Sequence, residues 1–321
     1  MAQQSDKKIV VLGTGGTIAG TAASAADNIG YTAAQVGVAQ LLDAIPALSA
    51  ALAGRALLTE QVAQIDSKDM SFAVWQQLAA RVAHWLAQPE VQGIVITHGT
   101  DTLEETAYFL QAVLNPAKPV VLTCAMRPAT AVAPDGPQNV LDAVAVATHP
   151  GARGVVAVCA GTIHSAFDVQ KVHPYRVDAF NSGDAGPLGY VEEGALRLLR
   201  NWPVADTVYA QLAIENIAKT AQWPRVEIVM NYAGASGAMV EALVAQGARG
   251  LVVAATGNGT LHHDLQAALL TAQRAGVKVV RASRCPNGRV LGQPGDAIPD
   301  SQGLSAVKAR VALMLALMQP V

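Results

Sequence analysis

The sequence predicts a two-domain α/β protein: a large N-terminal domain with a mainly parallel sheet flanked by helices, and a smaller C-terminal α/β domain with a parallel sheet. Short β-branched runs are continuously apolar rather than alternating, which is typical of strands buried on both faces. Helical patterns follow these runs, and 321 residues exceed one typical domain. We expect the N-terminal domain over residues 1–200, a linker over 201–224 and the C-terminal domain over 225–321.

In the large domain, continuous apolar runs predict strands at residues 9–12, 94–97, 120–123 and 155–158. Apolar periodicity predicts helices between them, at residues 36–45, 71–86, 102–113 and 140–148. Pro46 ends the first of these helices, and Ser71 is suited to cap the second. Strands that alternate with helices of this length indicate βαβ units and parallel pairing.

Residues 182–225 are rich in glycine, proline and polar side chains, which indicates the end of the large domain and a linker. A second βαβ pattern follows. Its expected strands and helices, in chain order, are 226–230, 237–246, 251–255, 261–274, 277–280 and 304–318.

Composition excludes several classes of protein. Hydrophobic residues make up 51% and charged residues 14%, which indicates buried cores rather than disorder. The net charge is −2 and the basic residues are scattered, so nucleic acid and membrane surfaces are not expected partners. Cys124, Cys159 and Cys285 lie far apart, which argues against a disulfide framework or a zinc site, and the first two are expected to be buried.

Two further features bear on ligands and location. The adjacent His262 and His263 lack metal-site spacing and are interpreted as a helix start. The first residues, MAQQSDKK, contain no apolar signal segment, and no run approaches the length of a membrane span. The sequence therefore predicts a cytoplasmic protein.

The first motif with chemical potential is G-T-G-G-T-I at residues 13–18, directly after the first strand. A dinucleotide-binding turn would need a third glycine where Ile18 stands, and a phosphate-binding P-loop would need Gly-Lys-Ser/Thr. What remains is a hydroxyl on a flexible turn at the carboxyl end of a strand, where open α/β sheets bind ligands.

The second motif is T-H-G-T-D-T-L-E-E-T at residues 97–106, also at a strand-to-helix junction. One interpretation is helix capping by Thr100, Asp101 or Thr102, with acidic residues at the positive end of the helix dipole. Capping does not explain a hydroxyl beside a carboxylate at a strand end. A hydroxyl nucleophile needs a base and an orienting group, and no Gly-x-Ser-x-Gly elbow is present.

These two segments, V-L-G-T-G-G-T-I-A (residues 11–19) and G-I-V-I-T-H-G-T-D-T-L (residues 93–103), resemble the two signatures of the bacterial-type L-asparaginases. Further stretches fit the same family in order along the chain: D-S-K-D-M (66–70), A-M-R-P (125–128), D-V-Q-K (168–171) and G-P-L-G-Y (186–190). The similarity covers nearly the whole chain and weakens in its last third.

The resemblance implies a set of catalytic roles. Thr17 would be the nucleophile that forms an acyl-enzyme ester. Thr100, Asp101 and Lys171 would form a relay that activates a hydroxyl or a water, which requires that burial or neighbours lower the pKa of the lysine. Tyr31 would lie on a mobile loop over the site and position the nucleophile.

The resemblance also implies how substrate is held. Ser67 and the backbone around Gly99 would bind the substrate α-carboxylate, and Asp101 would receive the α-ammonium. Backbone N–H groups near Thr100 would stabilise the oxyanion, and Ala125 would line the amide pocket.

No metal and no organic cofactor is implied. The resemblance implies a homotetramer built from close dimers, in which the C-terminal domain completes the active site of a neighbouring subunit. Asn231 and Ser236 are candidates for that contribution.

Three positions depart from the family pattern around the substrate amine. Lys68 follows the binding serine, where glutamine or glutamate is usual, and Gly234 replaces the second asparagine of an N-Y-A-N-A-S motif. The loop at residues 287–300 is short and offers no assignable glutamate. Either Lys68 points away, toward Asp66 or Asp69, or it selects a substrate without an α-amine or with an extra carboxylate.

The sequence thus predicts an amidohydrolase that converts L-asparagine to L-aspartate and ammonia, with weak glutaminase activity. The alternative within this chemistry is hydrolysis of a small amide that lacks the free α-amino group or carries an extra carboxylate. A tRNA-dependent amidotransferase subunit, a regulatory binding protein of the same fold and a nucleotide-dependent oxidoreductase are weaker readings. The short segment before the first strand, the retained reactive residues and Ile18, respectively, argue against them.

Overall fold

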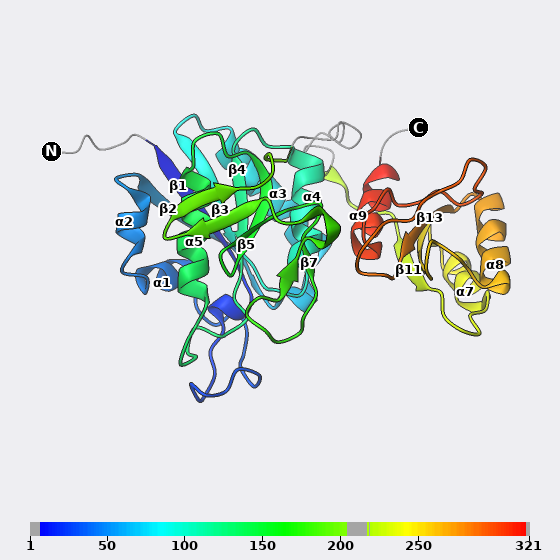
Figure 1. Cartoon of the computed structure of the whole chain (residues 1–321), viewed down its shortest axis with the longest axis horizontal. Helices are drawn as coiled ribbons and strands as arrows, with labels where there is room; N and C mark the ends of the chain where they lie inside the picture. The colour runs from blue at the N-terminus through cyan, green and yellow to red at the C-terminus, as the bar shows by residue number, and fades with distance from the viewer. Residues whose placement is uncertain (1–6, 204–216, 218, 319–321) are drawn as a thin grey trace. The chain divides into compact units, whose positions relative to one another are not determined.

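The computed structural model describes residues 7–203, 217 and 219–318. The chain divides into two compact units, residues 1–210 and 211–321 (Figure 1). Of the predicted linker at 201–224, residues 204–216 and 218 lie outside the described residues, so its boundaries stay a prediction. The large parallel-sheet domain and the smaller α/β domain predicted from sequence are confirmed.

Within the described residues of the first unit, eight strands form one sheet in the order β10-β9-β6-β5-β4-β3-β1-β2. Pairing is parallel from β2 through β5 and antiparallel from β5 through β10. The strands are β1 (Lys8–Gly15), β2 (Ala56–Ile65), β3 (Val91–Thr97), β4 (Pro119–Thr123), β5 (Gly154–Cys159), β6 (Thr162–Ser165), β9 (Gly189–Glu192) and β10 (Ala195–Leu198). A small antiparallel pair, β7 (Gln170–Lys171) with β8 (Phe180–Asn181), lies outside this sheet.

The four strands predicted in this unit correspond to β1, β3, β4 and β5, whose residues are almost entirely buried. Strand β2 is missing from the sequence-based prediction because it lies at the edge of the sheet, and most of its side chains are exposed or half-buried. Strands β9 and β10 fall in the segment predicted as irregular. Their tight turn places Glu193 and Gly194 at positive φ, which suits a two-residue hairpin.

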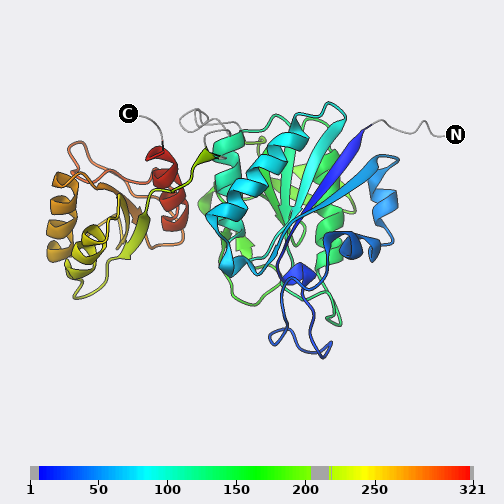
Figure 2. The same ribbon diagram turned by 180° about the vertical axis from the view of Figure 1, so that it is seen from behind.

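Helices cover both faces of the sheet. Helices α1 (Val38–Asp43), α2 (Leu48–Leu52) and α5 (Gly136–Thr148) pack their apolar side chains into one core with β1, β3, β4 and β5. Helices α3 (Phe72–Leu86) and α4 (Leu103–Leu114) cover the opposite face (Figure 2), where Trp75 stacks on Phe109 with ring centroids 4.8 Å apart. Ser71 caps α3 as predicted, accepting a hydrogen bond from the Val74 N–H.

The second unit has a parallel sheet in the order β11-β12-β13, with helix α9 on one face and α7 and α8 on the other (Figure 1). Its elements are β11 (Val226–Met230), α7 (Ala238–Ala245), β12 (Gly250–Ala255), α8 (His263–Arg274), β13 (Lys278–Ser283) and α9 (Ala306–Ala316). All six match the predicted elements to within a few residues. No helix in the described part of the chain has both the length and the apolar character needed to cross a membrane.

The cysteines follow the sequence-based expectation. Cys124 and Cys159 are buried at the ends of β4 and β5 with their sulfurs 3.2 Å apart, and Cys285 is exposed. The hydrogen bond with Cys159, together with burial, raises the pKa of Cys124 well above its usual value, so this thiol stays protonated.

One partly buried ion pair ties the edge strand β2 to helix α3. The Glu60 carboxylate accepts hydrogen bonds from Arg81 Nε (2.6 Å), Arg81 Nη2 (3.0 Å) and Trp85 Nε1 (2.8 Å). Burial alone would raise the pKa of Glu60, but the bonds from Arg81 and Trp85 lower it overall. A lowered folded-state pKa stabilises the fold above the ordinary glutamate pKa, and this stability is lost as the pH falls through the folded value.

We therefore expect Glu60→Gln to reduce the free energy of unfolding by about 1–3 kcal/mol at pH 7, because three N–H donors of Arg81 and Trp85 lose a charged acceptor. The deficit should shrink as the pH falls through the folded-state pKa, where the wild-type carboxylate is also neutral. Urea unfolding at pH 7 and at acidic pH measures both effects. The matched control is Glu192→Gln, which breaks a solvent-exposed pair with Arg197 and should change stability far less. Equal losses in the two variants would contradict this account.

Candidate active site

The predicted site residues follow four neighbouring strands of the parallel part of the sheet. Thr17 comes just after β1, Ser67 just after β2, Thr100 after β3 and Ala125 after β4. These strands are adjacent in the order β4-β3-β1-β2. Because carboxyl ends of parallel strands meet at one edge of the sheet, residues far apart in sequence come together there. Strand β2 explains why Ser67 joins the other motifs.

The turn that carries Thr17 depends on glycine. Gly15 and Gly16 have φ values of 99° and 83°, which residues other than glycine rarely adopt. A Cβ on Gly16 would overlap the Cα of Gly99, so the backbones of the two motif loops touch. The next residue, Thr17, begins a short 3-10 helix (Thr17–Ala19) and is 6% exposed. The two loops therefore hold the Thr17 and Thr100 hydroxyls in one neighbourhood.

Tyr31 lies against Thr17. Its phenolic oxygen is 2.7 Å from the Thr17 hydroxyl oxygen, so one hydroxyl donates to the other. The Tyr31 loop closes on itself through a bridge between Thr21 and Thr32. A second loop supports it, because the Ala129 N–H donates to the Gly20 carbonyl. The structure thus shows Thr17 and Tyr31, the nucleophile and the positioning residue that the resemblance implies, in direct contact.

Thr100, Asp101 and Lys171 form a compact polar cluster. The Lys171 ammonium donates to Thr100 Oγ1 at 2.8 Å and to Asp101 Oδ1 at 2.6 Å. Strand β7 positions this lysine, and its backbone N–H donates to the Glu104 carboxylate on α4. The Lys171 side chain is 18% exposed and that of Asp101 50% exposed, so the cluster has a covered side and an open side.

Ser67 connects the edge strand to the second motif. Its hydroxyl oxygen accepts a hydrogen bond from the Asp101 N–H at 3.1 Å, and its carbonyl accepts one from Thr102 Oγ1 at 2.8 Å. A Cβ on Gly99 would come within 2.5 Å of the Ser67 hydroxyl oxygen, so only glycine fits at that position. Thr102 therefore anchors the second motif to the Ser67 turn while also standing at the N-cap of α4.

The Lys68 side chain points toward two aspartates that lie close to it in the sequence. Its ammonium pairs with Asp69 at 2.5 Å and with Asp66 at 3.7 Å, and the side chain is 60% exposed. The hydrogen bond to Asp69, with the nearby charge of Asp66, raises the pKa of Lys68. Of the two interpretations considered from the sequence, this geometry matches the one in which Lys68 points toward Asp66 or Asp69.

Ala125 is buried, and the loop behind it is fixed by a residue that sequence reasoning missed. The Asp135 carboxylate accepts hydrogen bonds from the N–H groups of Met126 and Arg127, both at 2.9 Å. Asp135 stands at the N-cap of α5 without capping it through its side chain. An aspartate before a helical Gly-Pro resembles an ordinary cap, so the sequence carries no signal for this role.

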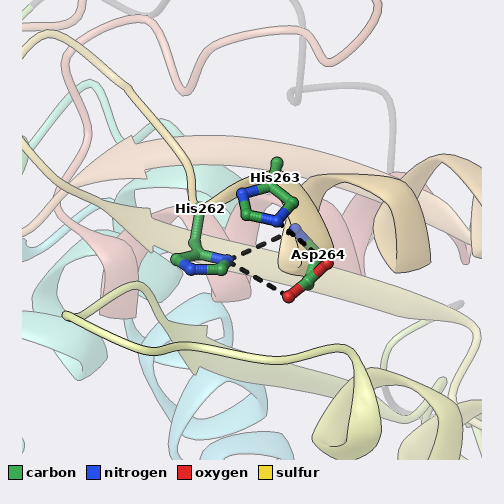
Figure 3. Close-up of side chains that lie close together, drawn as sticks. All are labelled: His262, His263 and Asp264. Carbon is green, nitrogen blue, oxygen red and sulfur yellow. Dashed lines mark hydrogen bonds and ion pairs between the residues drawn. The ribbon is translucent and has the colours of Figure 1, made fainter.

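Among the described residues, His262, His263 and Asp264 bring three potential metal-ligand atoms within 4.8 Å of one another (Figure 3). Their contacts are those of a helix start, as the sequence predicts. His262 Nδ1 accepts a hydrogen bond from the Asp264 N–H at 3.3 Å, and the two imidazole rings stack. The positive end of the α8 dipole opposes a cation at this place.

Comparison with known proteins gives the site its context. The family description "Asparaginase, N-terminal" matches residues 8–204, and "Glutaminase/Asparaginase C-terminal domain" matches residues 225–320. The chain belongs to the asparaginase family.

Several relatives resemble the asparaginase-family chain over almost its full length. It is 40% identical to L-asparaginase 2 of Escherichia coli strain K12, over 97% of this chain and 89% of that protein. It is also 40% identical to glutaminase-asparaginase of Pseudomonas fluorescens biotype A, over 96% of this chain and 86% of that protein. A crystal structure described as a probable cytoplasmic L-asparaginase from Campylobacter jejuni matches with a TM-score of 0.91 and 38% identity, covering 98% and 96% of the two chains.

In the C-terminal unit of this asparaginase-family chain, the N-Y-A-G-A-S segment follows β11. Asn231 is buried and its amide serves its own unit, donating to Thr256 Oγ1 and accepting from the His262 N–H. Gly234 has a φ of 75° with open space around it, and Ser236 is exposed. Of the two sequence candidates for completing a neighbouring site, Ser236 has the accessible side chain.

The contact between the two glycine loops leads to a test with a built-in control. Gly16→Ala and Gly54→Ala both place a methyl group at positive φ, 83° and 82°, but only the first meets other atoms. We expect about 1 kcal/mol of backbone strain in both variants and several kcal/mol more in Gly16→Ala, with loss of the Thr17 geometry. Thermal unfolding compares the two. Equal melting temperatures would contradict the close contact of Gly16 with Gly99.

Proposed function

We propose that this asparaginase-family amidohydrolase converts L-asparagine to L-aspartate and ammonia through an ester on Thr17. The observation that supports this proposal most strongly is the contact of the nearly buried Thr17 hydroxyl with Tyr31. The loop that carries Thr17 also touches, backbone to backbone, the loop that bears Thr100 and Asp101, which Lys171 contacts. Family membership and the names of the full-length relatives support the substrate.

The proposed first half-reaction forms the ester. The Thr17 oxygen attacks the side-chain amide carbon while its proton leaves toward a neighbouring oxygen, oriented by Tyr31. The tetrahedral intermediate carries an oxyanion, for which backbone N–H groups near Thr100 are the proposed donors. The carbon–nitrogen bond then breaks, and ammonia leaves after the nitrogen gains a proton.

The second half-reaction consumes water. A water molecule attacks the ester carbonyl, the carbon–oxygen bond to Thr17 breaks, and the threonine regains its proton. Lys171 donates to Thr100 Oγ1, which holds that oxygen in one position, and the Thr100 hydroxyl in turn donates to Asp101 Oδ1 at 3.5 Å. We assign Thr100, Asp101 and Lys171 the task of moving the proton in this step.

Substrate binding is proposed around Ser67 and Asp101. Within the described residues, the Asp101 carboxylate contacts Thr100 and Lys171 through Oδ1, and its side chain is half exposed, which suits recognition of an α-ammonium. Ser67 and the Gly99 backbone are the proposed contacts for the α-carboxylate, and Ala125 lines the amide pocket. Lys68, held by Asp69 and Asp66, leaves Asp101 as the charged group facing the amine.

Three finer points belong to the same proposal. The 40% identity to a glutaminase-asparaginase supports weak glutaminase activity. A homotetramer of close dimers is proposed from the family resemblance, and light scattering of the purified protein tests it. A cytoplasmic location stays a prediction, since one relative is described as cytoplasmic and another, from Haemophilus influenzae, as periplasmic.

The first test is ammonia release from L-asparagine, D-asparagine, L-glutamine and succinamate. Wild type should prefer L-asparagine, and Thr17→Ala should lower kcat by roughly ten-thousand-fold because the nucleophile is gone. The control Thr32→Ala removes an exposed hydroxyl next to Tyr31 and should keep wild-type activity. Full activity in Thr17→Ala would rule out this nucleophile.

A second test concerns the relay. Lys171→Met keeps most of the length of the side chain but removes the donor to Thr100 and Asp101, so we expect kcat to fall by roughly a hundredfold or more. Steady-state kinetics with L-asparagine measures it. The charge-matched control is Lys118→Met, because the Lys118 ammonium donates to the carbonyls of Leu86 and Gln88 instead. A loss confined to KM would instead make Lys171 a binding residue.

A third test separates the two interpretations of Lys68. Because Lys68 is paired with Asp69 and Asp66, we expect Lys68→Gln to leave kcat/KM for L-asparagine within about threefold and the ratio to succinamate unchanged. The same substrate panel measures it. A selective loss of succinamate hydrolysis would show that Lys68 recognises substrates lacking the α-amine.

A further inference from the structure

His98 stands between the end of β3 and the two residues that carry the relay, Thr100 and Asp101. Its side chain is completely buried, and its backbone N–H donates to the Thr123 carbonyl on β4. Burial lowers the pKa of His98 to about 4, so the imidazole is neutral at physiological pH. A neutral imidazole has one N–H donor and one bare nitrogen.

The hydrogen-bond partner settles which ring nitrogen carries the proton. His98 Nδ1 lies 2.7 Å from the Gly99 carbonyl oxygen, and a carbonyl can only accept. The proton is therefore on Nδ1, and Nε2 is a bare acceptor without a hydrogen-bond partner in the described part of the chain. An unpaired buried acceptor costs free energy. The imidazole nevertheless keeps this tautomer, because only a proton on Nδ1 can make the hydrogen bond to the Gly99 carbonyl.

This hydrogen bond fixes one peptide plane. The carbonyl of Gly99 and the N–H of Thr100 belong to the same trans peptide and point in opposite directions. With the carbonyl held toward the buried imidazole, the Thr100 N–H is directed away from it. Packing restrains the same peptide as well, since Gly99 lies against Gly16 and Ser67.

We propose that His98 is a positioning residue: its Nδ1–H holds the Gly99 carbonyl, and the peptide so fixed aims the Thr100 N–H and presents the Thr100 hydroxyl to Lys171. This rests on the proposed function, because it assigns the Thr100 group a part in amide hydrolysis. His98 itself touches no substrate and exchanges no proton during the reaction. Its contribution is the fixed orientation of a neighbouring donor.

Two amide variants test this proposal. Asparagine can place its side-chain nitrogen where Nδ1 lies, whereas glutamine is longer by one methylene and cannot do so without moving the backbone. We expect His98→Asn to keep kcat for L-asparagine within about fivefold and His98→Gln to lower it by about tenfold to a hundredfold. The KM of both should stay within about threefold, because Ser67 and Asp101 are not changed.

The controls separate positioning from folding. Thermal unfolding and L-aspartate binding by calorimetry identify any variant that has lost its structure. Equal kcat losses in the two variants at equal melting temperature, or wild-type kcat in both, would overturn the proposal.

A substrate-free measurement keeps it testable if the variants fold poorly. The imidazole nitrogen spectrum of ¹⁵N-histidine-labelled wild type should show His98 protonated at Nδ1, and protonation at Nε2 would overturn the proposal. Failure of the proposed function is recognised separately, because wild type would then release no ammonia from L-asparagine while the His98 spectrum stayed unchanged.

Discussion

The backbone contact between Gly16 and Gly99 is the constraint on which the site depends. Two loops from adjacent strands, β1 and β3, meet with no side chain between them. The residue after Gly16 is Thr17, and the residue after Gly99 is Thr100. A methyl group at Gly16 would separate the two loops and move the Thr17 and Thr100 hydroxyls apart. Glycine at these two positions is therefore needed both for the fold of the loops and for the arrangement of the hydroxyls.

The charged and titratable side chains around this contact differ in how far they are exposed and in what they pair with. In the cluster of Thr100, Asp101 and Lys171, the Lys171 side chain is mostly covered and that of Asp101 is half exposed, so the carboxylate is the more accessible of the two charged groups. Behind the motif lies a neutral, buried imidazole at His98. Lys68 brings a second cation close to the site in sequence, but two aspartates hold it in a local network. In the proposed function, Asp101 is then the charged group left to meet the substrate α-ammonium.

Four strands of the large sheet and several site residues were predictable from the sequence. A strand that was missed, β2, differs from these four for a physical reason. Strands β1, β3, β4 and β5 were recognisable because burial on both faces leaves continuous apolar runs. Strand β2 was not, because an edge strand mixes polar and apolar residues. The rule that ligands bind at the carboxyl ends of parallel strands placed Thr17 and Thr100 together, and the family resemblance supplied Lys171, Tyr31 and Ser67.

Pairings that depend on side-chain direction lay beyond the sequence. The support that Asp135 gives to the loop of Ala125 and the bond from His98 to Gly99 require three-dimensional contacts, and the sequence left two orientations of Lys68 open, of which the structure shows the one toward Asp69 and Asp66. Each involves residues close in sequence whose alternative orientations are equally compatible with the local pattern. The roles of the site residues remain proposals that chemistry must test.

The most direct test of the central claim is to trap the ester. Wild-type enzyme mixed with L-asparagine and quenched in acid within milliseconds, then digested and analysed by mass spectrometry, should carry one aspartyl group on the peptide that contains Thr17. Lys171→Met should accumulate more of it, because the water step is slowed. An aspartyl group on the Thr100 peptide instead, or none during steady turnover in either enzyme, would contradict the account.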